Sequence, residues 1–287
     1  MSTTPKKTWL ITGCSSGFGR ILAEAALARG DQVVVTARKL DAIADFAARY
    51  PQTTRAIALD VTKPGDPAQA VAAAEEAFGG LDILVNNAGF GLIGAIEEVE
   101  PEEYRPMFET NVFGLIEMTR AALLLLRRTA AATGQRSGRI VNFSSVGGMT
   151  GRTGFGLYNG TKFAVEGISE ALAIEVAEHG INVIIVEPGA FRTEFLGGSI
   201  TAAKTRLPAY AKTSGATRDY STTNNGRQLG DPHRAIPVIL QAVDAAEPPL
   251  RLPLGKDAYA RINEKLAKVH ADMAAWEKLA TATGFDA

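Results

Sequence analysis

Short runs of valine, isoleucine and leucine alternate along this chain with longer stretches in which apolar residues recur every three or four positions. The short runs predict seven strands, at residues 8–12, 32–37, 56–59, 83–86, 139–143, 182–186 and 250–254. The longer stretches predict helices at residues 18–29, 40–49, 67–78, 101–130, 155–178, 232–245 and 257–281. We therefore predict an α/β fold with a doubly wound, parallel, seven-stranded sheet and helices on both of its faces.

Glycine and proline support several of the predicted helix ends. Gly30 and Gly180 each follow a helix at the position that commonly adopts a left-handed conformation, and Pro101 stands where the fourth helix would begin. The chain has no internal repeat and no block of charge. We therefore expect a single domain over residues 1–287, ending in a helical tail at about 257–287.

Residues 197–231 interrupt this rhythm. The segment is rich in serine, threonine, glycine, alanine and asparagine, shows little periodicity, and is too long for an ordinary connection. It is either a mobile lid over a site or a variable surface excursion. Its position after the sixth strand favours a lid, which we place at about 191–231.

Composition excludes several classes of function. The chain is 46% hydrophobic and 21% charged, which allows a substantial core. Its formal net charge of −1 gives no electrostatic reason to expect nucleic acid or an anionic membrane as partner. The longest apolar run, at 121–126, is too short to span a bilayer, and the first residues contain no apolar stretch of signal-peptide length. We expect a soluble, cytoplasmic protein.

Disulfide and metal chemistry are also not expected. The single cysteine, Cys14, cannot form an intrachain disulfide and is most simply a small residue in a turn. None of the three histidines, His179, His233 and His270, stands beside another potential ligand at metal-binding spacing. We therefore predict that the chain holds no metal.

The segment between the first strand and the first helix reads TGCSSGFG and has the character of a phosphate-binding turn. Its candidate cofactor residues are Gly13, Ser15, Ser16, Gly17, Phe18 and Gly19. Glycines there allow a tight turn and a close approach to a pyrophosphate, whose charge the amides and dipole of the following helix would meet. Alone, the spacing is also that of an ordinary turn. After the first strand of an alternating α/β chain it favours a nucleotide.

The end of the second strand indicates which nucleotide. No acidic residue stands there to bind the ribose 2′-hydroxyl of NAD; the strand ends instead in Arg38 and Lys39. The guanidinium of Arg38 could pair with the 2′-phosphate of NADP, although both cations could equally begin a solvated loop. We prefer NADP(H), with NAD(H) as the alternative.

Further motifs follow in order at the strand ends, over residues 7–194. They are Asp60 and Val61, then Asn87, Ala88 and Gly89, then Asn111, Ser145, the pair Tyr158 and Lys162 in a YxxxK spacing, Pro188 with Gly189, and Thr193. In this combination the chain resembles the short-chain dehydrogenase/reductase family, which has a Rossmann fold, and in particular its branch of 17β-hydroxysteroid dehydrogenases and bacterial carbonyl reductases.

The resemblance implies roles for most of these residues in holding the cofactor. Asp60 would bind the adenine amino group and Val61 would pack beside the ring. The segment 87–89 would line the cofactor ribose, and Thr193, after Pro188 and Gly189, would hold the nicotinamide carboxamide. Taken singly, each of these positions could be an ordinary turn.

Tyr158 is the candidate acid and base. Hydride transfer to a carbonyl leaves an alkoxide that needs a proton, and the reverse reaction needs a base. Lys162 lies one helical turn on, where its charge is expected to lower the pKa of the phenol. Ser145 would donate to the substrate oxygen, and by resemblance Lys162 would bind the nicotinamide ribose. The alternative is a surface pair on an amphipathic helix.

Asn111 has two readings. By resemblance it would hold a water that links Lys162 to solvent. It could equally be a polar residue in the middle of a helix that bonds a neighbouring turn.

The predicted function is an NADP(H)-dependent oxidoreductase that moves a hydride between nicotinamide and a ketone, aldehyde or secondary alcohol. An NAD-linked alcohol dehydrogenase and a non-catalytic dinucleotide-binding regulator are the alternatives. Phe191, Phe195 and Leu196 are candidate substrate residues; together with Leu207, Tyr210 and Tyr220 they form either an apolar pocket or the packing of their own segment.

Assembly is also suggested by analogy. The helix at 101–130, with its leucines at 123–126, and the Tyr158 helix would form the interface of a homodimer or homotetramer. Both helices could instead pack only in the core of the monomer.

Overall fold

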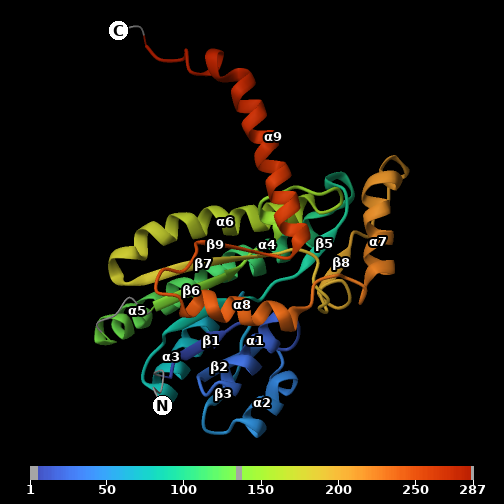
Figure 1. The fold of residues 1–287 in the computed structure, drawn as a ribbon. Helices are drawn as coiled ribbons and strands as arrows, with labels where there is room; N and C mark the ends of the chain where they lie inside the picture. Colours follow the sequence, from blue (N-terminus) through green and yellow to red (C-terminus); the bar gives the residue numbers. More distant parts are fainter. Residues whose placement is uncertain (1–5, 134–137, 286–287) are drawn as a thin grey trace.

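The structure, a computed structural model, describes residues 6–133 and 138–285. It contains a seven-stranded sheet in which every neighbouring pair is parallel, in the order β3-β2-β1-β4-β6-β7-β9 (Figure 1). The strands are β1 (Thr8–Ile11), β2 (Gln32–Ala37), β3 (Thr54–Ala58), β4 (Ile83–Asn86), β6 (Gly138–Phe143), β7 (Ile181–Pro188) and β9 (Arg251–Leu254). The predicted doubly wound sheet is confirmed.

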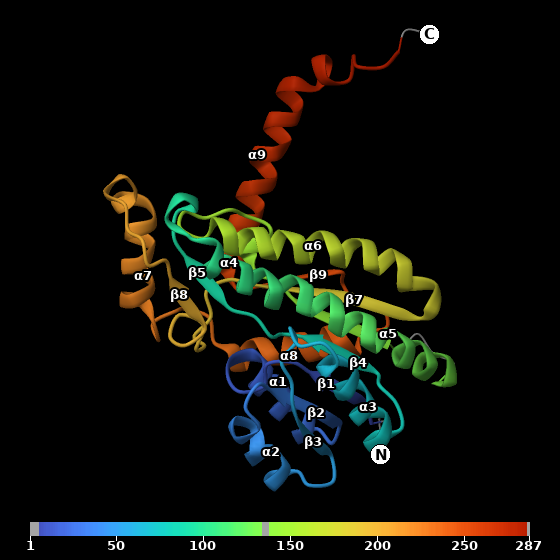
Figure 2. The same cartoon turned by 180° about the vertical axis from the view of Figure 1, so that it is seen from behind.

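Helices cover both faces of this sheet (Figures 1 and 2). The α-helices of the described residues are α1 (Gly17–Ala28), α2 (Ala44–Arg49), α3 (Asp66–Phe78), α4 (Pro101–Phe108), α5 (Gly114–Thr133), α6 (Gly156–Val176), α7 (Ala216–Asn224), α8 (Pro232–Asp244) and α9 (Lys256–Ala280), of which α7 and α9 stand away from the sheet. One core joins the sheet to α1, α2 and α8, and a second joins it to α3, α5 and α6. In β1, Trp9 and Ile11 enter the first core and Leu10 the second, because successive strand residues point to opposite faces. Burial on both faces explains why the strands are continuously apolar.

The strand order places a crevice at the carboxyl ends of β1 and β4. The chain winds outward from β1 to β2 and β3, then crosses to β4 on the other side of β1. Connections therefore leave β1 and β4 in opposite directions, and ligands of open α/β sheets bind at such a switch point. The glycine-rich turn and the segment after β4 both lie at this edge.

The predicted helix ends are confirmed. Gly30 and Gly180 have φ of 93° and 72°, a region that glycine adopts without a Cβ clash. Pro101 is the first residue of α4.

The predicted helix at 101–130 is not one regular helix. It consists of α4, a π-helical turn over Glu109–Phe113, and α5. Pro106, inside α4, has no amide hydrogen to donate to the preceding turn, and the wider turn follows it. Asn111 lies in this turn and is buried. Apolar periodicity does not register one extra residue in a turn, so the pattern predicted an unbroken helix.

The predicted lid segment contains a strand and an α-helix that the sequence did not indicate. Strand β8 (Ile200–Ala202) pairs in parallel with β5 (Gly91–Ile93), and α7 follows it. A three-residue strand carries too little periodicity to be recognised, and the polar sequence of α7 favours a loop. Contacts with the rest of the fold help to hold α7 in place: its Thr217 hydroxyl donates to the carbonyl of Thr153 at 2.9 Å. That this segment closes over a substrate stays a prediction.

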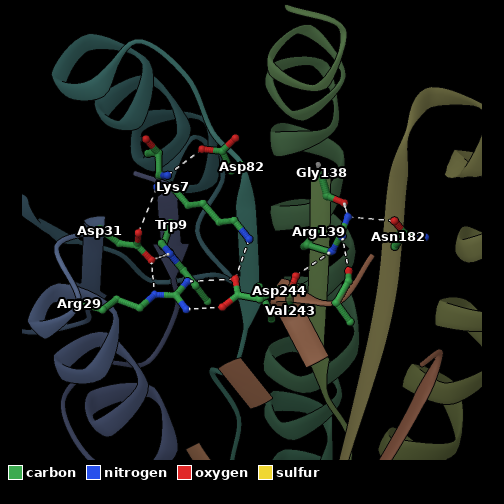
Figure 3. Close-up of polar contacts among 12 residues, drawn as sticks. Lys7, Trp9, Arg29, Asp31, Asp82, Gly138, Arg139, Asn182, Val243 and Asp244 are labelled. Carbon is green, nitrogen blue, oxygen red and sulfur yellow. Dashed lines mark hydrogen bonds and ion pairs between the residues drawn. The ribbon is translucent and has the colours of Figure 1, made fainter. Parts of the chain in front are cut away.

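Ion pairs join the amino ends of the strands to α8 (Figure 3). Asp244 accepts from Lys7 Nζ and from Arg29 Nη1, each at 2.7 Å. Arg29 Nε also pairs with Asp31 at 2.6 Å, and the Trp9 indole donates to the same carboxylate at 2.8 Å. This network joins the carboxyl ends of α1 and α8 to the start of β1, at the edge of the sheet opposite the crevice.

Arg139, at the start of β6, is a buried cation in the same region (Figure 3). Its guanidinium donates to the carbonyls of Val243 and Ala245 at the end of α8, at 3.1 and 3.0 Å, and to Asn182 Oδ1 at 2.9 Å. The last carbonyls of a helix have no partner within it, so Arg139 caps α8 from the sheet.

The leucine run in α5 is divided between core and surface. Leu125 and Leu126 belong to the second core, whereas Leu124 is 60% exposed. Phe163 and Ile174 on α6 are exposed as well. The inner faces of both helices therefore pack in the monomer, and the interface suggested for their outer faces stays a prediction.

Candidate active site

A cavity of about 1250 Å³ runs along the carboxyl edge of the sheet. Most of the predicted site residues line it: Gly13, Ser15, Ser16, Gly17, Phe18, Arg38, Asp60, Val61, Asn87, Ala88, Gly89, Ser145, Tyr158, Lys162, Pro188, Gly189, Phe191, Thr193, Phe195 and Leu196. The two other predicted residues, Gly19 and Asn111, are not part of the lining. Gly19 packs against Asn87, and Asn111 bonds the backbone of Phe90. Residues that are far apart in the sequence are thus gathered around one space of dinucleotide size.

The phosphate end of the cavity is the turn before α1. This helix has no side-chain cap at Ser16 and no acidic residue in its first turn, so its amides remain available to an anion. Gly13 and Gly17 have φ of 73° and 58°. A Cβ on Gly19 would lie 2.4 Å from Asn87 Nδ2, so only glycine lets α1 pack this closely against the segment after β4. These features fit a dinucleotide pyrophosphate.

Asn87 holds the two halves of the crevice together. Its amide Nδ2 donates to the carbonyls of Thr12 and Gly13, at 2.9 and 3.1 Å. The Thr12 hydroxyl accepts in return from the amides of Asn87 and Ala88. The turn after β1 is thereby fixed against the turn after β4, an arrangement that motif spacing did not reveal.

The far end of the nucleotide cavity carries a free cation. Arg38 follows β2, is exposed, lines the cavity and makes no ion pair with any described residue. Asp60 accepts from the amide and hydroxyl of Thr62, at 3.1 and 2.7 Å. Burial opposes ionisation of Asp60, but these bonds and the charges of Lys63 and Arg38 outweigh it and lower its pKa. One anion, Asp60, and one cation, Arg38, thus line this end of the cavity.

Tyr158, on the first turn of α6, is buried in the wall of the cavity at 8% exposure. Burial raises the pKa of its phenol to about 12, and a hydrogen bond with Ser145 partly offsets that rise. Ser145 follows β6, and its hydroxyl also accepts from the Gly147 amide at 3.0 Å. Ser145 and Tyr158 therefore lie in contact in the wall of the cavity.

Lys162 departs from the expected geometry. Its Nζ lies 5.9 Å from the centre of the Tyr158 ring and donates to the carbonyl of Phe143 at 2.7 Å. Burial lowers the pKa of this ammonium to about 8, against the attraction of Glu166. The predicted depression of the Tyr158 pKa is therefore wrong for this structure, because burial of the phenol raises its pKa by more than the hydrogen bond with Ser145 lowers it.

Asn111 hydrogen-bonds a neighbouring turn, as one of the two interpretations of this residue predicted. Its Oδ1 accepts from the Phe90 amide at 3.0 Å, while Nδ2 donates to the Phe90 carbonyl and to Thr161 Oγ1, at 2.9 and 3.1 Å. The side chain clamps the segment after β4 to the π-helical turn and to α6. A water-holding role for Asn111 stays a prediction.

The substrate end lies beside Tyr158 and is aromatic. The rings of Phe195 and Phe155 lie 5.5 and 5.9 Å from the Tyr158 ring, measured between centroids. Phe191 packs instead 5.3 Å from Phe18, at the phosphate turn. Phe191 therefore lies beside the phosphate turn, and the substrate role predicted for it stays a prediction.

Some apolar and aromatic residues of the predicted lid segment line the cavity and others do not. Tyr220 lines the cavity together with Leu196. Leu207 and Tyr210 do not belong to its lining, and the Tyr210 hydroxyl donates to Glu97 at 2.6 Å. Leu196 and Tyr220 therefore line the cavity, whereas Leu207 and Tyr210 lie outside its lining.

Several polar residues that line the cavity were not predicted from the sequence. They are Arg105, Glu109, Arg152, Gln228, Asp257 and Arg261. They come from α4, from the π-helical turn, from the loop before α6, from the residues preceding α8 and from α9, and none belongs to a short motif. Arg152, with its Cζ 4.7 Å from the centre of the Tyr220 ring, shows how tertiary structure alone brings them to the site.

Within residues 6–133 and 138–285, no three or more histidine, cysteine or acidic side chains are placed to share a metal ion. Over the same ranges, no helix combines the length and apolarity needed to cross a bilayer.

Comparison with known proteins identifies the family. A family model described as short chain dehydrogenase matches residues 7–203. Oxidoreductase BOA17 of Botryotinia fuckeliana is 34% identical over 278 residues, covering 96% of this chain and 99% of that protein. The 17-beta-hydroxysteroid dehydrogenase type 6 of Mus musculus is 36% identical over 199 residues, covering 68% of this chain and 60% of that one.

A solved structure extends the match to the whole fold. A short-chain dehydrogenase from Streptomyces avermitilis has a TM-score of 0.90 and 44% identity, covering 98% of this chain and 100% of that one. The resemblance drawn from the motifs is thereby confirmed. The chain belongs to the short-chain dehydrogenase family and is an NAD(P)-dependent oxidoreductase.

Proposed function

We propose that this enzyme uses NADPH to reduce the carbonyl group of a ketone or aldehyde, with Tyr158 as the proton donor. The observation that carries the proposal is the contact between Tyr158 and Ser145 in the wall of a cavity whose other end is an uncapped helix terminus. A proton donor, an oxyanion donor and a phosphate site thus share one space.

When bound, a reduced nicotinamide supplies the hydride in this scheme. The Ser145 hydroxyl donates to the carbonyl oxygen as negative charge develops there, and the Tyr158 hydroxyl gives its proton to that oxygen. The phenolate left on Tyr158 is stabilised by the ammonium of Lys162, one helical turn away. Asn111 keeps α6 and the segment after β4 at a fixed separation during these steps.

The protonation of Tyr158 supports reduction as the proposed direction. With its pKa raised to about 12 by burial, the phenol carries its proton at neutral pH. A protonated phenol can act at once as an acid, whereas alcohol oxidation would first require its ionisation. A protonated Tyr158 therefore supports the role of proton donor.

The preference for NADPH rests on Arg38. Its guanidinium is unpaired among the described residues and lines the cavity just after β2, where NAD enzymes of this fold carry an acid. A planar guanidinium suits the oxygens of a 2′-phosphate. An NAD-linked alcohol dehydrogenase is the alternative.

The test is reduction of a panel of carbonyl compounds with NADPH deuterated at the transferable position of the nicotinamide. We expect an alcohol product that is heavier by one deuterium, formed more efficiently than with NADH. Binding of NADPH without transfer to any member of the panel would favour a regulatory protein. A clear preference for NADH would overturn the assignment to Arg38.

A further inference from the structure

The last helix, α9, leaves the body of the molecule. Its first turns are anchored, because Ala258 and Ile262 are buried against Val146 and Met149. From residue 263 to residue 280 no side chain is buried, and both views show the helix extending away from the sheet and its layers (Figures 1 and 2). Nothing in the described part of the chain covers this stretch.

The free part of α9 nevertheless carries an apolar stripe. Apolar residues recur at alternating steps of three and four, beginning in the anchored turns with Tyr259 and Ile262 and continuing over the free part with Leu266, Val269, Met273 and Trp276. Leu266, Met273 and Trp276 are 43%, 64% and 65% exposed. A strict seven-residue repeat keeps such a stripe in line with a partner helix that supercoils with it, so the stripe is typical of a coiled-coil seam.

We propose that α9 pairs with α9 of a second copy of this chain in an antiparallel coiled coil. In the register that seats Leu266 on Val269 of the second copy, the flanking positions bring Lys265 opposite Asp272. The two-fold axis repeats the same pair in reverse, which is the self-complementarity required of a symmetric dimer. Trp276 then packs on Tyr259 of the second copy.

The charges favour this arrangement over two others. In a parallel pair, Asp272 would face Glu277 of the second copy, so like charges would meet. A helix that lies on a membrane is typically rich in cations on its polar face. Over residues 263–280 the ionised side chains are balanced, with three lysines, Lys265, Lys268 and Lys278, and three acids, Glu264, Asp272 and Glu277.

Cysteine cross-linking tests the orientation directly. Cys14 is the one cysteine of the chain and is buried, with its thiol pKa raised to about 12 by that burial, so thiols introduced on α9 react alone. We expect Leu266→Cys and Val269→Cys chains to form a disulfide-linked dimer when mixed, and neither to do so alone. Self-linking of Leu266→Cys chains, or the absence of any cross-link, would overturn the proposal.

Charge exchange tests the interface without disturbing its apolar seam. Lys265→Glu and Asp272→Lys should each raise the dissociation constant on the order of tenfold and halve the mass seen by light scattering at low micromolar concentration. The double variant should restore the wild-type mass. Lys268→Glu, on the outer face, is the matched control and should change nothing.

Two results would contradict the proposal. One is an unchanged mass in both single variants. The other is a wild-type chain that does not associate through α9 but sediments with phosphatidylcholine and phosphatidylserine vesicles, which would assign the stripe to a membrane surface.

Discussion

Lys162 donates through Nζ to the carbonyl oxygen of Phe143 at 2.7 Å, so the ammonium is held at the end of β6 and not at the phenol oxygen. The same Nζ lies 5.9 Å from the centre of the Tyr158 ring. The charge of Lys162 therefore acts on Tyr158 across a short gap. That charge matters most after Tyr158 has given up its proton, when a phenolate stands beside it.

This relationship predicts a pH dependence for carbonyl reduction. Burial lowers the pKa of Lys162 to about 8, so the side chain is charged below that pH and loses its charge as the pH rises through it. We expect kcat/KM for reduction to be level on the acidic side and to fall above pH 8, because the phenolate then lacks its stabilising cation. Lys162→Arg keeps the charge and should remove the inflection. A wild-type profile that stays flat to pH 9.5 would show that the Lys162 charge is not needed.

Arg38 is predicted to determine the choice of cofactor. Arg38→Ala removes a charge-assisted hydrogen bond to the 2′-phosphate and should raise KM for NADPH about 10- to 100-fold while leaving KM for NADH nearly unchanged. Steady-state kinetics with both cofactors checks this. Lys39→Ala, at a neighbouring cation outside the cavity lining, is the control. Equal losses with NADPH and NADH would mean that Arg38 serves the turn and not the phosphate.

Arg139 provides a stability prediction on the opposite edge of the sheet. Arg139→Ala should lower the free energy of unfolding by about 2–4 kcal/mol, since the buried carbonyls of Val243 and Ala245 lose their donor. Denaturant titration measures the loss. Activity at low temperature should persist, because Arg139 lies away from the cavity. A change below about 0.5 kcal/mol would show that water replaces the guanidinium there.

Much of the fold was predictable because the sheet is buried on both faces. Strands such as β2, with Val33 to Val35 all buried, are apolar at every position and stand out against amphipathic helices. The shared position of Tyr158 and Lys162 at the cavity was predictable because the two residues are separated by one helical turn, which is a local relation.

Other features of the fold and the site could not be predicted from the sequence, because they depend on contacts between distant residues. The wide turn that carries Asn111 adds one residue to a helix without breaking its apolar stripe. The bond from Lys162 to Phe143 depends on where α6 sits on β6, and the desolvation of Tyr158 depends on the whole wall around it. No local pattern records either quantity.

The most direct measurement is deuteride transfer by Tyr158→Phe, a change that removes one hydroxyl from a buried ring. We expect kcat for carbonyl reduction with deuterated NADPH to fall about 10²- to 10⁴-fold, while the affinity for NADPH in a direct titration stays near that of the wild type. The phenylalanine ring still fills the wall beside Phe155 and Phe195, so the cavity should keep its shape. Wild-type transfer by this variant would contradict the assignment of Tyr158 as the proton donor.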